Sequence, residues 1–123
     1  MKVSELNGAL LDYWVARAAG YSESNDSLMM HIDGTCRIAW HEDDDPDSLF
    51  NPSASWMWGG PIIQKALISV LHGPVDDPRS VGYWTGFIRP SDDDGYDGET
   101  PLIAGMRAYV ASKFGAEVPD ESI

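Results

Sequence analysis

The clearest pattern of apolar and polar positions lies in the last third of the chain, over residues 100–115. Six apolar side chains recur there at helical spacing and form one stripe: Leu102, Ile103, Met106, Tyr109, Val110 and Phe114. Thr100 is a favourable N-cap, and Pro101 suits the first helical position, where a missing N–H breaks no intrahelical bond. Lys113 favours the negative end of the helix dipole, and Gly115 suits the left-handed backbone after a helix. The segment therefore predicts a complete helix with both of its ends.

Two other segments also have helical spacing. Residues 7–19 place their apolar side chains on one face, and Gly20 can end that helix. A further helix is predicted from Gly60 or Pro61 to His72, where Gly73 and Pro74 stop it. Its apolar side chains cover more than half of the circumference: Ile62, Ile63, Ala66, Leu67, Ile68, Val70 and Leu71. We therefore expect it to be the most buried helix.

Strand-like segments occur between these helices. Residues 28–32 and 35–40 are two predicted strands, separated by Asp33-Gly34. This dipeptide favours a hairpin with a type I′ turn, in which both central residues have positive φ. Residues 81–89 are rich in bulky aromatic and branched side chains and predict a third strand. A fourth short strand is considered near Phe50 or Val75.

The order α-β-β-α-β-α predicts an α+β fold, a single small domain over residues 1–123 with a mainly antiparallel sheet packed with helices. The length of 123 residues and the apolar fraction of 43% suit one domain with a core. Residues 116–123 are expected to be a frayed tail. No apolar run reaches the ~18 residues of a membrane span, and the first residues lack a signal-peptide pattern. A cytoplasmic protein is therefore expected.

Charge changes the picture most, because the net charge of −12 is concentrated in two runs, residues 42–47 and 92–99. Such a surface repels nucleic acid and anionic membranes and attracts a basic protein. The candidate partner-binding residues are therefore Asp43, Asp44, Asp45, Asp92, Asp93 and Asp94. The second run does not have the spacing of an EF-hand calcium loop, so we expect a solvated loop and no metal.

Sequence signals of catalysis are lacking. A single cysteine, Cys36, forms no internal disulfide, and its place in a predicted strand favours a packed, buried thiol. The histidines His31, His41 and His72 are too scattered for a metal motif. The chain contains no P-loop, G-x-S-x-G or H-E-x-x-H motif. We therefore assign no catalytic residue and no cofactor, and an enzyme is the less favoured interpretation.

One segment is nevertheless a candidate ligand site, the turn before the helix predicted at Pro61. Glycines there let a ligand approach the backbone, and a helix N-terminus attracts anions. Tryptophans could line the approach and serines could donate hydrogen bonds. The candidate residues are Ser53, Ser55, Trp56, Trp58, Gly59 and Gly60. The favoured interpretation is structural: the glycines only form the turn and the tryptophans cover the core. Trp14, Trp40 and Trp84 are expected in the core, whereas exposed tryptophan at 56 and 58 would indicate a protein interface.

Three stretches together carry a family resemblance. Residues 11–20 are L-D-Y-W-V-A-R-A-A-G, residues 50–65 are F-N-P-S-A-S-W-M-W-G-G-P-I-I-Q-K, and residues 100–118 are T-P-L-I-A-G-M-R-A-Y-V-A-S-K-F-G-A-E-V. Their order and spacing resemble the small phage and prophage proteins of the NinX type, a family with no assigned activity. The resemblance implies a phage-encoded accessory protein in the cytoplasm of a bacterial host. The usual S-T-D-W-A-Q-G-G of that family is here S-A-S-W-M-W-G-G, so any role of its acid in relatives is lost at Ser55.

Three functional hypotheses follow. The preferred one is a non-enzymatic interaction module whose acidic surface binds a basic host or phage protein, with no direct nucleic acid or membrane binding. The alternative is a small-ligand binder or enzyme with a site at the 53–60 turn. The third is a self-associating homodimer, because a broad apolar helix in a short chain leaves surface to bury.

Overall fold

The computed structural model describes residues 1–41, 45–72, 83–88 and 95–119, and all structural statements concern these residues. The elements in chain order are η1 (Val3–Glu5), α1 (Gly8–Ala18), β1 (Leu28–Met30), β2 (Cys36–Ile38), β3 (Ser48–Leu49), α2 (Trp56–Ala66), β4 (Ser69–His72), β5 (Trp84–Phe87), β6 (Tyr96–Gly98) and α3 (Pro101–Phe114). The strands form two antiparallel sheets, β1-β2-β3 and β4-β5-β6. This confirms the α+β class and the antiparallel pairing, with the strands divided between two sheets.

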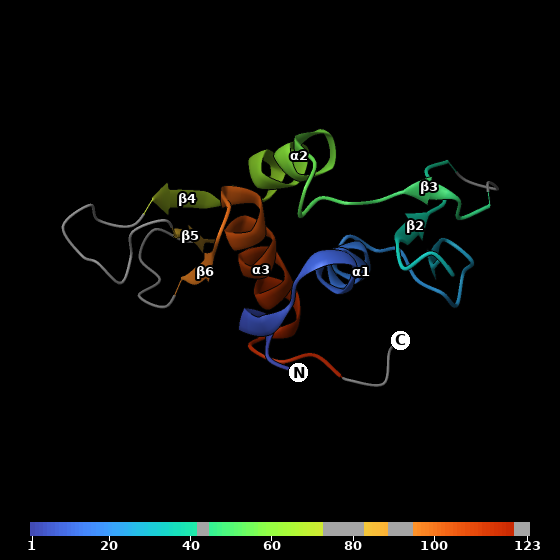
Figure 1. Cartoon of the computed structure of the whole chain (residues 1–123), viewed down its shortest axis with the longest axis horizontal. Helices are drawn as coiled ribbons and strands as arrows, with labels where there is room; N and C mark the ends of the chain where they lie inside the picture. Colours follow the sequence, from blue (N-terminus) through green and yellow to red (C-terminus); the bar gives the residue numbers. More distant parts are fainter. Residues whose placement is uncertain (42–44, 73–82, 89–94, 120–123) are drawn as a thin grey trace.

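Helix α3 is the centre of the molecule. In Figure 1 the sheet β4-β5-β6 lies on one side of it, and α1 with the sheet β1-β2-β3 lies on the other. The predicted N-cap is confirmed, since the Thr100 hydroxyl accepts a hydrogen bond from the Ile103 N–H at 3.1 Å. The helix ends before Gly115 as predicted, but Gly115, with φ of 87° and ψ of −165°, is outside the left-handed helical conformation. The sheet β4-β5-β6 packs closely against α3 because β5 has a glycine at position 86. A Cβ on Gly86 would lie 2.5 Å from the Ala104 carbonyl oxygen. The buried residues of α3 are Leu102, Ala104, Gly105, Met106, Ala108 and Val110.

The other half of the core lies between α1 and the first sheet. Met30 pairs with Cys36, which confirms the predicted hairpin. Its turn is not type I′, because Gly34 has positive φ (85°) and Asp33 does not. The Asp33 carboxylate instead accepts hydrogen bonds from the N–H and hydroxyl of Thr35, and these bonds lower the pKa of Asp33 to about 2. This side-chain capping favours a type I turn closed by one left-handed glycine.

Helix α2 differs most from the prediction. It begins at Trp56 and ends at Ala66, so a helix over 60–72 is wrong, and Pro61 lies inside the helix. The expectation that it is the most buried helix is also wrong, because Gly59 is its only buried residue. Leu67 ends the helix with φ of 57°, and Ser69–His72 form β4, in which Val70 pairs with Gly86 of β5. A short apolar run is compatible with a helix or with a strand. Residues 69–72 form a strand because they pair with β5.

The two chain ends that the structure describes lie side by side. The Val3 N–H donates to the Ala116 carbonyl at 2.9 Å, the N-terminal amine donates to the Val118 carbonyl at 2.8 Å, and Val118 is buried. Residues 116–118 are therefore paired with the N-terminus rather than frayed, and residues 120–123 lie outside the described residues. The short strand considered near Phe50 is present as β3, whereas Val75 lies outside the described residues. No helix in the described part of the chain is long and apolar enough to cross a membrane.

Candidate functional site

A buried acid on α1 anchors the segment before α2. The Ser53 N–H donates to the Asp12 carboxylate at 2.8 Å, and both residues are buried. Burial raises the pKa of Asp12 to about 6, and its hydrogen bonds with Ser53 oppose that rise. Cys36 is buried as predicted, and burial together with the charge of Asp12 raises the pKa of its thiol to about 12. This cluster ties α1, β2 and the start of α2 together, with a thiol that stays protonated.

The two glycines of the predicted ligand turn lie inside α2, and their surroundings differ. A Cβ on Gly59 would lie 2.6 Å from both the Pro52 carbonyl oxygen and the Leu102 side chain. The protein itself therefore fills the space beside Gly59. Gly60 has room, with its nearest neighbour 3.7 Å away on the Trp56 ring. Because Gly60 has no Cβ, it avoids the clash with the Pro61 ring that the Cβ of another residue would make in a helix.

Aromatic side chains form a surface around the first turn of α2. Trp58 is half-buried between the buried Phe50 and the exposed Trp40, with ring centroids 5.2 and 4.9 Å away. Trp40 also stacks on His41 at 5.7 Å. We give the name aromatic surface to two sets of residues: Trp40, His41 and Trp58, which ring contacts of Trp40 join, and Trp56 and Met57, which are exposed on the same turn of α2.

Exposure separates these tryptophans from the core. Trp56 is 57% exposed, Met57 63% and Trp40 54%. The expectation that Trp40 lies in the core is therefore wrong, because β2 ends at Ile38 and strand alternation no longer applies two residues later. Trp14 is buried as expected, whereas Trp84 is half-buried in β5. Ser55, the N-cap of α2, makes no side-chain capping bond.

The acidic candidates fall largely outside the described residues. Asp45 is described and exposed, in the loop between the aromatic surface and β3. Residues 43, 44 and 92–94 lie outside the described residues, so their part in binding stays a prediction. In the described part of the chain, no group of three His, Cys, Asp or Glu residues could hold a metal ion.

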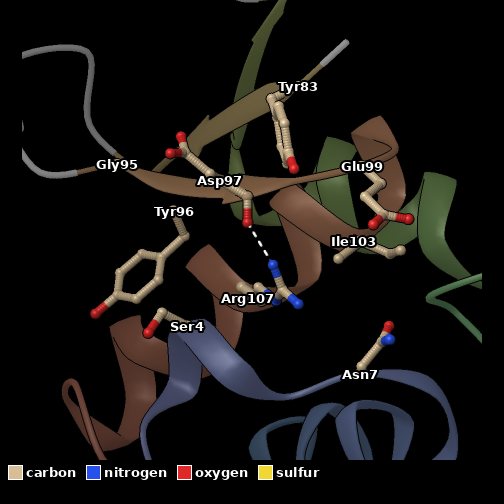
Figure 2. A pocket seen from close by; sticks show the side chains of 9 residues that line it. All are labelled: Ser4, Asn7, Tyr83, Gly95, Tyr96, Asp97, Glu99, Ile103 and Arg107. Carbon is tan, nitrogen blue, oxygen red and sulfur yellow. Dashed lines mark hydrogen bonds between the residues drawn. The ribbon is translucent and has the colours of Figure 1, made fainter. Parts of the chain in front are cut away.

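A second site, which the sequence did not suggest, is a cavity of about 430 Å³ in front of Arg107. Arg107 projects from α3, and Figure 2 shows its guanidinium between β6 and the segment that carries Asn7. Its Nε donates to the Leu6 carbonyl at 2.9 Å, and its Nη1 donates to the Asp97 carbonyl at 2.6 Å. Burial lowers the pKa of Arg107, and the carboxylates of Glu99 and Asp97 partly offset that lowering. The sequence signal that could have indicated this site is Arg107 itself, because it is a cation in a helix whose other residues are mostly apolar.

Together these features describe a small α+β domain built around one central helix, with an aromatic surface at the first turn of α2 and a polar cavity beside α3. A family model described as Bacteriophage P22, NinX matches residues 2–113. The chain therefore belongs to the NinX family of phage proteins, whose function is unknown, and the resemblance seen in the sequence is confirmed. A comparison with curated proteins gave no match.

Proposed function

We propose that this protein is a non-enzymatic interaction module that binds a basic host or phage protein in the cytoplasm of the bacterial host. The binding site is the aromatic surface together with the acidic loop that follows it. The observation that carries this proposal is the exposure of Trp40 and Trp56 at more than half of their surface, with the Trp40 ring packed on Trp58 and Trp58 packed on the buried Phe50.

The aromatic surface has the chemistry of an interface centre. Tryptophan is enriched among the few residues that dominate binding energy, because it buries a large area with little loss of side-chain freedom. The contacts from Phe50 through Trp58 to Trp40 hold the Trp40 ring in place before any partner arrives. Trp56 and Met57 stand on the first turn of a helix, which fixes their backbone. A preorganised surface of this kind has less entropy to lose on binding.

Charge determines which partner the surface favours. The acidic run begins directly after His41, so carboxylates border the aromatic surface in the chain. The net charge of −12 would steer a basic protein towards this surface and repel nucleic acid and anionic membranes. If the basic partner also binds nucleic acid, this protein would compete with the nucleic acid for the same surface of that partner.

Affinity capture from a lysate of the bacterial host tests the proposal with three variants. One combines Trp40→Ala with Trp56→Ala, and a second changes the six acidic candidates to Asn. The third, Leu71→Ala, is the control, because Leu71 is 60% exposed on β4 and outside the aromatic surface.

The proposal predicts a basic protein retained by the native chain and by Leu71→Ala. Both other variants should lose it, the Asn variant most strongly at low salt because screening already weakens charge attraction at high salt. Thermal melting shows that each variant is folded. Retention by the double tryptophan variant, or the absence of any saturable partner, would contradict the proposal.

A further inference from the structure

We propose that the cavity in front of Arg107 binds a small zwitterion, with a carboxylate on Arg107 and a protonated amine on Glu99. The cavity shares no residue with the aromatic surface, so this site is independent of the proposed function.

The Arg107 guanidinium is held in a fixed orientation. Its two hydrogen bonds go to backbone carbonyls, one before α1 at Leu6 and one in β6 at Asp97. Two carbonyls fix the plane of the guanidinium, and they use two of its five N–H donors. The remaining donors are available for a ligand oxygen. A planar, preorientated fork of this kind suits a carboxylate, which it binds through two parallel hydrogen bonds.

The positive charge of Arg107 has no direct counter-ion among the described residues. Arg37, for example, pairs with the Asp33 carboxylate at 3.1 Å, whereas no ion pair within the described residues includes Arg107. The neighbouring Asp97 carboxylate instead accepts a hydrogen bond from the Thr85 hydroxyl at 2.6 Å. A partly buried cation without a paired anion is costly, so a ligand carboxylate at this position offsets that cost.

Glu99 makes a zwitterion more favourable than a simple anion. Glu99 and Tyr83 both line the cavity, and Figure 2 shows the Glu99 carboxylate near the start of α3. A phosphate or a dicarboxylate would place extra negative charge against Glu99 in a chain that already carries −12. A protonated amine turns that repulsion into attraction. Of the other polar side chains in Figure 2, Asp97 carries a second carboxylate, which bonds to the Thr85 hydroxyl, and those of Ser4, Asn7 and Tyr96 are neutral.

The size of the cavity limits the ligand to a small molecule. A volume of about 430 Å³ falls at the lower end of the range for small-molecule sites, roughly 300 to 1,000 Å³. The proposed ligand carries a carboxylate and an amine. Free ω-amino acids, which hold both groups in one short chain, are therefore the probes.

NMR titration of the whole protein tests the assignment through the side-chain Nε–H resonance of Arg107. The probes are glycine, β-alanine and 4-aminobutyrate, with butyrate and butylamine as controls that carry a single charge. At least one amino acid should shift this resonance saturably and bind about fivefold tighter than either control, because a partly exposed ion pair contributes about that much. Butyrate binding as tightly as the best amino acid, or no shift with any probe, would overturn the proposal.

Two exposed glutamates provide a matched pair of variants. Glu99→Gln should remove the preference for amino acids over butyrate, whereas Glu117→Gln, outside the cavity lining, should leave it unchanged. Arg107→Lys should weaken every carboxylate probe, and a melting curve shows whether loss of the two carbonyl bonds has unfolded it. Glu99→Gln removes neither of these hydrogen bonds, so its preference between amino acids and butyrate tests the proposal even if Arg107→Lys does not fold. An unchanged preference in Glu99→Gln would contradict the assignment of the amine.

Discussion

Helices α2 and α3 each contain one proline, and they differ in how far they are buried. In α3, Pro101 is the first helical residue and Thr100 caps the helix through its hydroxyl. In α2, Pro61 is the sixth residue and Ser55 makes no capping bond. Six residues of α3 are buried, against Gly59 alone in α2. The comparison indicates that α3 holds the fold together, while α2 displays side chains.

The two helices should differ most in how much the free energy of unfolding falls when a methionine is replaced by alanine. Met106 on α3 is fully buried and Met57 on α2 is 63% exposed. Met106→Ala should lower the free energy of unfolding by about 3 kcal/mol, because it removes a buried side chain and leaves a cavity. The matched change Met57→Ala should alter it by less than about 0.5 kcal/mol. Urea unfolding measures both, and similar losses in the two variants would show that α2 is part of the core.

Close packing at the one buried residue of α2 should have the next largest effect. Gly59→Ala places a methyl group 2.6 Å from the Pro52 carbonyl oxygen and should cost about 2 kcal/mol in unfolding free energy. Gly60→Ala finds open space, although a Cβ before Pro61 is disfavoured in a helix, so we expect a change within about 1 kcal/mol. Thermal melting of the two variants tests this, and equal effects would contradict the packing described for Gly59.

The acid that anchors the start of α2 should make stability depend on pH. The folded-state pKa of Asp12 is about 6, above its ordinary value of 3.8, so the folded chain binds this proton more tightly. Its contribution to stability is therefore greatest at low pH and is lost as pH rises through about 6. Asp12→Asn keeps an oxygen for the Ser53 N–H and should stabilise the protein by roughly 2 kcal/mol at pH 7.

This difference between Asp12→Asn and the native chain should shrink towards pH 4, where Asp12 is protonated in the folded state. Urea unfolding from pH 4 to 8 measures it. A constant difference over that range would show that Asp12 does not titrate with a raised pKa.

The helix caps should give the smallest difference. Thr100→Ala removes the hydroxyl that accepts from the Ile103 N–H and should cost about 1 kcal/mol. Ser55→Ala removes no capping bond and should be nearly neutral. A thermal-shift comparison is sufficient, and a larger loss from Ser55→Ala would mean that α2 is capped after all.

The parts of the fold that were predicted from sequence depend on neighbouring residues. The signals at Thr100, Pro101 and Gly115 are local, and so is the hairpin around Gly34. The end of α2 at Leu67 was missed because it depends on the pairing of β4 with β5, a contact distant in sequence.

The candidate sites were harder to predict for the same reason. The exposure of Trp56 decides between core and interface, and burial depends on packing that is not local. The cavity at Arg107 is built from the segment before α1, from β6 and from α3, which only the folded chain brings together.

Photo-crosslinking tests most directly the claim that α2 displays a binding surface. A photoreactive amino acid would replace Met57 in one protein and Leu71 in another, two positions that are 63% and 60% exposed. Both proteins would be illuminated in a lysate of the bacterial host. The account predicts a crosslink to a basic protein from position 57 and none from position 71. The same crosslink from both positions, or none from position 57, would contradict it.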